Sequence, residues 1–293
     1  MPVVSPFVWI QAARPKTLWA GVAPALIGTA MAAADGFFHL SSALFALLGA
    51  VLIQVGTNYC NDYCDFRKGA DTSARVGPVR ATQAGLVAPG AMLAATVIVF
   101  LLAALTAVPL FLRAGWPVAA ISAAGILSGV LYTAGPKPLA YVGLGDIFVL
   151  LFFGPVAVAG TYFVQALRVE SYVIFAGLAP GLLSVAVLTV NNLRDIETDR
   201  FAGKRTLAVR LGRGFARVEY AACILGATLV PLVIYAAKGW TAGLPGVLVA
   251  VPGALAIRAV WRTDGPALNP LLGRTALLLL LYSVLFSLGW WLA

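Results

Sequence analysis

Nine long apolar runs, separated by short polar segments, divide this sequence from one end to the other. About 20 apolar residues of α-helix span the hydrocarbon core of a bilayer, where backbone polar groups are satisfied only within helices or closed barrels. We therefore expect an all-α polytopic membrane protein with about nine transmembrane helices. The expected spans are residues 18–34, 43–57, 90–112, 118–133, 145–164, 172–190, 220–237, 243–257 and 275–292.

The composition leads to the same expectation. Of the 293 residues, 61% are hydrophobic and only 11% are charged, whereas a soluble domain has about 25% charged residues. No soluble domain or linker is visible, so residues 1–293 are expected to form a single integral-membrane domain. Residues 1–16 lack the basic segment and short apolar core of a cleavable signal peptide, which predicts that the run from Leu18 is retained as a span.

The basic residues predict how the chain is oriented in a bacterial inner membrane. Lys and Arg are enriched in cytoplasmic loops. A cytoplasmic N-terminus places all but three of the 20 basic residues on that side, and the exceptions are Arg113, Arg168 and Lys238. The net charge of +9 is therefore assigned to membrane topology, and no nucleic-acid partner is expected.

Six of the eleven acidic residues lie in two short segments, 58–71 and 191–200, each at the cytoplasmic end of an expected span. Oxygen-bearing side chains recur there every four residues, which places them on one face of a helix. They are Asn61 and Asp65 in the first segment, and Asn191, Asp195 and Asp199 in the second. Gly69 allows the first helix to end, so that Asp71 can turn back toward the same place.

A bound cation explains why carboxylates gather beside hydrocarbon, where each costs about 2.5–3.5 kcal/mol at mid-membrane. All the candidate ligands are oxygen atoms, which suits a hard ion such as Mg²⁺. Basic residues accompany both segments: Arg67, Lys68, Arg75 and Arg80, and Arg194, Arg200, Lys204 and Arg205. Carboxylates and bases around a hard metal favour the binding of a diphosphate. The alternative, two solvated helix ends, is weakened because the same Asn-x-x-x-Asp pattern occurs twice.

At these residues the sequence resembles the UbiA superfamily of intramembrane aromatic prenyltransferases, and most closely its members that prenylate 1,4-dihydroxy-2-naphthoate. The first motif of those members, N-x-x-N-D-Y-x-D-x-x-x-G-x-D, is matched by residues 58–71, and the second, N-N-x-R-D-x-E-x-D-x-x-x-G-K-R-T-L-A, by residues 191–208. Segments 75–80 and 132–146 also resemble those members. The enzymes that prenylate 4-hydroxybenzoate have their last two first-motif acids four residues apart. Here Asp65 and Asp71 are six apart.

The resemblance implies helices around a central cavity and a reaction of menaquinone biosynthesis. A polyprenyl group would pass from polyprenyl diphosphate to 1,4-dihydroxy-2-naphthoate, with loss of diphosphate and CO₂. The implied catalytic residues and ligands of Mg²⁺, two ions in all, are Asn61, Asp65, Asp71, Asn191, Asp195 and Asp199. The implied diphosphate-binding residues are Lys68, Arg75, Arg80, Lys204 and Arg205.

Candidates for binding the acceptor are less distinctive. Arg14, Lys16 or Lys137 would hold its carboxylate, and each also fits the role of a topology anchor. Tyr63 and Tyr132 would offer aromatic faces to an allylic cation, and each also fits simple packing. Two other functions stay open: prenylation of another phenol, such as 4-hydroxybenzoate or homogentisate, and, outside enzymes, a transporter of lipid diphosphates.

Overall fold

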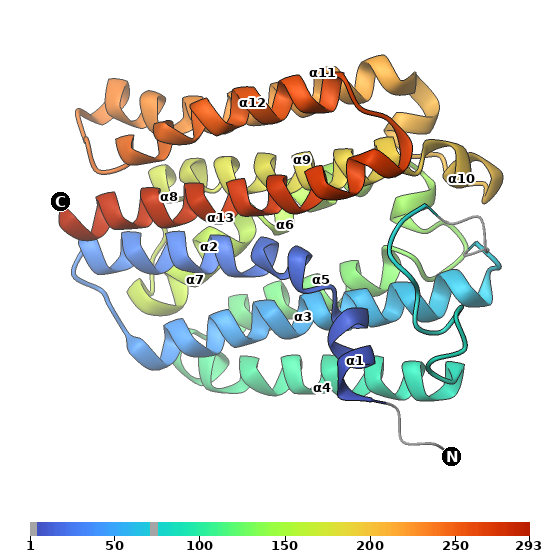
Figure 1. Cartoon of the computed structure of the whole chain (residues 1–293). Coiled ribbons are helices and arrows are strands. Elements are labelled where there is room, and N and C mark those ends of the chain that lie inside the picture. The colour runs from blue at the N-terminus through green and yellow to red at the C-terminus, as the bar shows by residue number, and fades with distance from the viewer. Residues whose placement is uncertain (1–4, 71–75) are drawn as a thin grey trace.

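Helices joined by short loops make up the computed structural model, which describes residues 5–70 and 76–293 (Figure 1). A short helix, α1 (Pro6–Ala13), precedes the bundle, and two more short elements, η1 (Leu139–Tyr141) and α10 (Ile196–Phe201), lie between its members. The helices of the bundle are α2 (Pro15–Ala34), α3 (Leu40–Arg67), α4 (Pro89–Ala114), α5 (Trp116–Leu131), α6 (Gly145–Phe152) with α7 (Pro155–Ala166), α8 (Ser171–Ala176) with α9 (Leu178–Arg194), α11 (Leu207–Lys238), η2 (Leu244–Val249) with α12 (Ala250–Trp261), and η3 (Gly265–Leu268) with α13 (Asn269–Leu292).

The bundle has the number of crossings that the apolar runs predict. Within the described residues, eight helical segments are long and apolar enough to cross a membrane, and α5 is a shorter apolar helix of 16 residues. Together they confirm the all-α polytopic fold with about nine transmembrane helices. The helix limits differ from the predicted spans because helices continue into polar sequence: α3 runs on to Arg67, and α11 begins at Leu207, with a break in its helical geometry at Gly212.

Two of the expected spans are interrupted, which the apolar pattern does not indicate. One breaks between α6 and α7 at Gly154, and the other between α8 and α9 at Gly177. The two breaks lie against each other: a Cβ atom on Gly177 would come within 2.6 Å of the Pro155 Cα, and one on Gly154 within 2.7 Å of the Gly177 carbonyl oxygen. Side chains larger than glycine would therefore separate the two broken spans.

Helix α9 lies in the larger hydrophobic core. It packs against α11 and α13, and α13 in turn packs against α2. The completely buried side chains of this core include Ile27, Leu183, Tyr220 and Phe286, one from each of these four helices. Because α9 ends at Arg194, this packing fixes the position of the second acidic segment.

Both acidic segments lie at the same end of the bundle. In Figure 1 the C-terminal end of α3 and the short helix α10 are together on the right, whereas the C-terminus of α13 is on the left. An even number of crossings separates the start of α2 from the end of α3 and from the end of α9, so these three points lie near the same end of the bundle. The fold is therefore consistent with the prediction that both acidic segments lie on the same side of the membrane.

Candidate active site

A cavity of about 540 Å³ lies within the bundle, with walls from α2, α3, α4, α5, α7 and α9. The end near the acidic segments is polar, and the far end is lined by apolar residues such as Phe45, Leu110, Val118 and Val164. Every predicted metal ligand that the structure describes lines the polar end: Asn61, Asp65, Asn191, Asp195 and Asp199. Asp71 lies outside the described residues.

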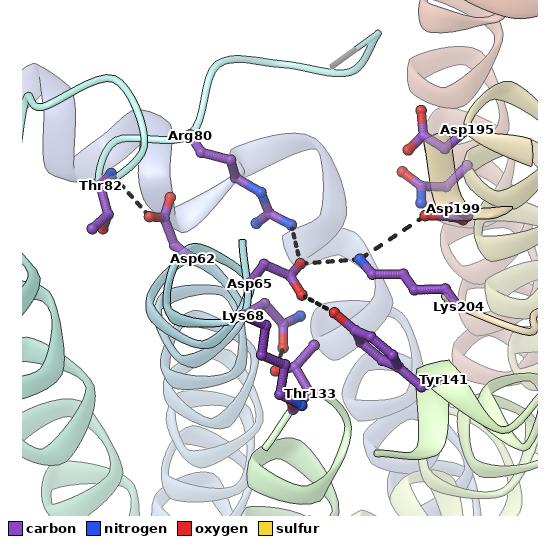
Figure 2. Close-up of polar contacts among 12 residues, drawn as sticks. Asp62, Asp65, Lys68, Arg80, Thr82, Thr133, Tyr141, Asp195, Asp199 and Lys204 are labelled. Carbon is purple, nitrogen blue, oxygen red and sulfur yellow. Dashed lines mark hydrogen bonds and ion pairs between the residues drawn. The ribbon is translucent and has the colours of Figure 1, made fainter. Parts of the chain in front are cut away.

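Asp65 is contacted by three polar side chains at this end of the cavity (Figure 2). Its side chain is 1% exposed. The carboxylate accepts hydrogen bonds from Arg80 Nη2 at 3.1 Å, from Lys204 Nζ at 3.2 Å and from the Tyr141 hydroxyl at 3.2 Å. One carboxylate thus connects three segments that are far apart in the sequence.

The end of α3 directs Asp65 and its neighbours. Gly69 has a φ of 64°, and the Ala70 amide donates to the Asp65 carbonyl at 3.0 Å, a helix ending that glycine favours. The predicted termination at Gly69 is therefore confirmed. On the last turns of α3, Asn61 accepts a hydrogen bond from the Thr133 hydroxyl at 2.7 Å, which ties it to the end of α5.

Asp62 has a different role from the neighbouring Asp65. Its two carboxylate oxygens accept hydrogen bonds from the backbone amides of Ala81 and Thr82, both at 3.0 Å, and the residue is 2% exposed. Figure 2 shows the contact with Thr82. Asp62 therefore anchors the segment that carries Arg80 to α3, a positioning role that the sequence analysis missed although the residue lies inside the first motif.

The second motif places a guanidinium against its central aspartate. Arg194 donates to both carboxylate oxygens of Asp195, at 2.7 and 2.5 Å, and to the Asn191 side chain at 2.8 Å. Its third nitrogen donates to Asn269 of α13 at 3.0 Å. Because Arg194 is 4% exposed, the pair is buried and its geometry is bidentate, which fixes the orientation of Asp195.

Lys204 links the two motifs. Its ammonium nitrogen lies 3.2 Å from Asp65 and 3.9 Å from Asp199, and Figure 2 shows it between the two carboxylates. The backbone holds it there, since the Lys204 amide donates to the Asp199 carbonyl at 2.8 Å. The expectation that two separate segments meet at one place is thereby met in the described structure.

Tyr141 is a site residue that the sequence analysis did not single out. Its hydroxyl bonds to Asp65, and its ring lies under two ammonium groups: Lys68 Nζ is 4.7 Å and Lys204 Nζ 5.3 Å from the ring centre. Its carbonyl accepts from the Arg205 amide at 3.0 Å. The only signal in the sequence is the likeness of residues 132–146 to the family.

The predicted diphosphate-binding residues separate into two groups. Arg80 and Lys204 line the cavity. Lys68 turns away from it and donates to the Thr133 and Gly135 carbonyls, at 2.6 and 3.5 Å. Arg205 is exposed and is not part of the cavity wall. Arg75 lies outside the described residues.

The predicted acceptor-binding residues separate in the same way. Arg14 and Tyr132 line the cavity. Lys16 and Lys137 are exposed on the surface, and Tyr63 packs against the small cluster that includes Tyr59 and Val87.

The donor atoms of the polar end fit a hard divalent cation. All five predicted ligands that line the cavity present carboxylate or amide oxygens, and its described wall contains no His or Cys, which matches the preference of Mg²⁺. In the described residues no three His, Cys, Asp or Glu side chains form a metal-binding group; instead Arg80, Arg194 and Lys204 neutralise the carboxylates.

Comparison with known proteins gives consistent matches over nearly the whole chain. The model of the UbiA prenyltransferase family matches residues 21–281. The 1,4-dihydroxy-2-naphthoate octaprenyltransferase of Escherichia coli (strain K12) is 38% identical, over 96% of this chain and 94% of its own. The protein of the same name from Mycobacterium tuberculosis is 41% identical, over 94% of each chain. A solved structure of a UbiA homolog from Archaeoglobus fulgidus, bound to GPP and Mg²⁺, shares the fold with a TM-score of 0.66 at 15% identity, covering 96% of this chain and 99% of that one.

Proposed function

This chain belongs to the UbiA prenyltransferase family, and from this membership we propose that it transfers a polyprenyl group from polyprenyl diphosphate to 1,4-dihydroxy-2-naphthoate. Diphosphate and CO₂ leave, and the reduced (quinol) form of demethylmenaquinone, a precursor of menaquinone, is formed. Residues 1–293 act as one integral-membrane prenyltransferase domain. The named relatives are transferases, which favours an enzyme over a transporter of lipid diphosphates.

The observation that carries the proposal is the meeting of both acidic motifs at the polar end of an otherwise apolar cavity. A polyprenyl diphosphate has the same division, with a charged group at one end of a long hydrocarbon chain. Arg80 and Lys204, which line the polar end, would bind the diphosphate oxygens by charge-assisted hydrogen bonds. The apolar walls would hold the hydrocarbon and keep water from the reacting carbon.

The cofactor that fits this site is Mg²⁺, which the structure of the Archaeoglobus fulgidus homolog also contains. Two ions would be held by Asn61, Asp65, Asp71, Asn191, Asp195 and Asp199. When bound, the metal neutralises the diphosphate and stabilises it as the leaving group. Because Lys204 already lies between Asp65 and Asp199, its ammonium group would move with the arriving diphosphate and keep the local charge balanced.

The transfer step follows from the chemistry of the acceptor. The carbon–oxygen bond of the prenyl diphosphate breaks, its electron pair leaves with the diphosphate, and an allylic cation remains. Tyr132, whose ring lines the cavity, would stabilise this cation through its aromatic face. The electron-rich ring carbon that bears the carboxylate forms the new bond, and loss of CO₂ restores aromaticity. Arg14 would hold the carboxylate until then.

Acceptor preference tests this function. The purified protein, returned to lipid and given one polyprenyl diphosphate, is expected to prenylate 1,4-dihydroxy-2-naphthoate faster than equimolar 4-hydroxybenzoate or homogentisate. The physical reason is that a fused naphthalene ring loses less aromatic stabilisation on attack than a single benzene ring, and that loss of CO₂ from the attacked carbon then restores aromaticity without a base. Mass spectrometry of the lipid-soluble products measures the ratio. A preference for either of the other two phenols would assign the chain to another branch of the family.

We also propose that the polar end of the cavity faces the cytoplasm of a bacterial cell. The basis is the charge bias, which leaves Arg113, Arg168 and Lys238 as the exceptions. Single cysteines at Ala70, Ala202 and Ala237, in a chain without its three native cysteines, test the orientation. A thiol reagent that cannot cross the membrane is expected to label the third position in intact cells and the first two only after lysis. The reverse pattern would show the opposite orientation.

A further inference from the structure

Gln54 is a buried amide on the cavity wall for which the protein provides no partner. It is 8% exposed and lines the cavity from α3. Within residues 5–70 and 76–293, no hydrogen bond joins its side chain to another residue. The amide atoms are open to the cavity rather than enclosed by protein, so their partner is expected to come from the cavity.

The amides Asn58 and Asn61 of the first motif, and several hydroxyl groups of the wall, have partners within the described protein. Asn58 donates to the Ala13 carbonyl at 2.8 Å, and Asn61 accepts from Thr133. Thr57, Thr106 and Ser184 donate to carbonyls of their own helices, as such residues commonly do. Asn192, on α9, has no such bond among the described residues either, but it lies three residues from Asp195 and so belongs to the aspartate end.

The position of Gln54 marks the boundary between the polar and the apolar part of the wall. On the α3 face that lines the cavity, the residues toward Asp65 are polar. The residues on the other side, from Ile53 to Phe45, are apolar. At 1.5 Å per residue, Gln54 lies about 16 Å along the helix from Asp65. That distance places it beyond a diphosphate held at the aspartates, and a polyprenyl chain has no polar atom to offer it.

The remaining substrate does have such an atom. A 1,4-dihydroxynaphthoate carries a hydroxyl beside its carboxylate and a second hydroxyl on the opposite side of the ring. Arg14, which lines the cavity, lies next to Ala13, whose carbonyl is bonded to Asn58 one helical turn from Gln54. A ring whose carboxylate faces Arg14 would lie beside this part of α3, and its 4-hydroxyl could then reach Gln54.

We propose that Gln54 hydrogen-bonds the 4-hydroxyl of the acceptor and so selects a 1,4-diol over a phenol with one hydroxyl. This inference rests on the proposed function. The amide provides both an acceptor and donors, and it is the only described neutral group at this depth of α3 that can pair with the hydroxyl. A substrate without that hydroxyl leaves the amide unpaired, which is a strong basis for discrimination.

The test replaces Gln54 with methionine, which keeps the length of the side chain and removes its hydrogen bonds. With the full-length protein in lipid, Gln54→Met is expected to raise the KM for 1,4-dihydroxy-2-naphthoate about tenfold. The KM for geranyl diphosphate should not change. The inhibition constant of 1-hydroxy-2-naphthoate, which lacks the 4-hydroxyl, should be equal in the variant and the wild type. Because no bond within the described protein is lost, the melting temperature should be unchanged or higher.

Gln165→Met is the matched control. Gln165 is 2% exposed and lies outside the cavity wall. It donates to Thr29 and to the Thr161 carbonyl, and it accepts from the His39 amide. Its replacement is expected to lower the melting temperature and leave both KM values unchanged. An unaltered acceptor KM in Gln54→Met, or an equal loss for 1-hydroxy-2-naphthoate, would overturn this inference alone. A wild type that does not prenylate the dihydroxynaphthoate would overturn the proposed function and this inference with it.

Discussion

Replacing Asp65 with asparagine is expected to lower the rate of prenyl transfer by about a hundred- to a thousandfold, the effect of removing one group that stabilises developing charge. Asp65 accepts from Arg80, Lys204 and Tyr141 at once, and in the proposed mechanism it also binds Mg²⁺. Asparagine keeps the shape and loses the charge. The measurement is kcat with saturating substrates, and Asp195→Asn is expected to behave similarly.

Asp35→Asn provides the control for this prediction. Asp35 lies at the other end of the bundle, where it accepts hydrogen bonds from the hydroxyls of Tyr162 and Tyr172, far along α2 from the polar end of the cavity. Its replacement should reduce stability and leave kcat near the wild-type value. The wild type in excess EDTA should lose activity as Asp65→Asn does and recover it with added Mg²⁺. Full turnover by Asp65→Asn, or by the wild type in EDTA, would show that the carboxylates do not hold a catalytic metal.

Much of the fold could be predicted because the membrane imposes it. Apolar runs long enough to cross a bilayer must be helical, so the crossings and the common end of the two acidic segments followed from the pattern. The breaks at Gly154 and Gly177 could not be predicted in the same way. They depend on the contact between two spans, which the apolar pattern of a single span does not contain.

The candidate site could be predicted where helix periodicity determined it, and less well in the loops. Asn61, Asp65, Asn191 and Asp195 lie in or at the end of regular helices, and their spacing placed them together on the cavity wall. Lys68 follows the last turn of α3, where the chain direction changes, and its long side chain reaches the Thr133 carbonyl instead of the cavity.

The roles of Tyr141 and Asp62 could not be predicted from the sequence. Tyr141 belongs to a short turn after α5, and only the three-dimensional structure brings it to Asp65. Asp62 belongs to the first motif, but it does not line the cavity and has backbone amides as partners. Residue type and spacing identified the motif, whereas the division of roles within it required the contacts.

The fate of the acceptor's carboxyl carbon tests the proposed reaction most directly. No described histidine lies near the motifs to remove a ring proton, since His39 is at the opposite end of α3, where it bonds Ser42. Departure of CO₂ restores aromaticity without a strong base. Purified protein supplied with carboxyl-labelled 1,4-dihydroxy-2-naphthoate, geranyl diphosphate and Mg²⁺ is therefore expected to release one labelled CO₂ for each prenylated product. A prenylated product that keeps the label would contradict the proposed transfer.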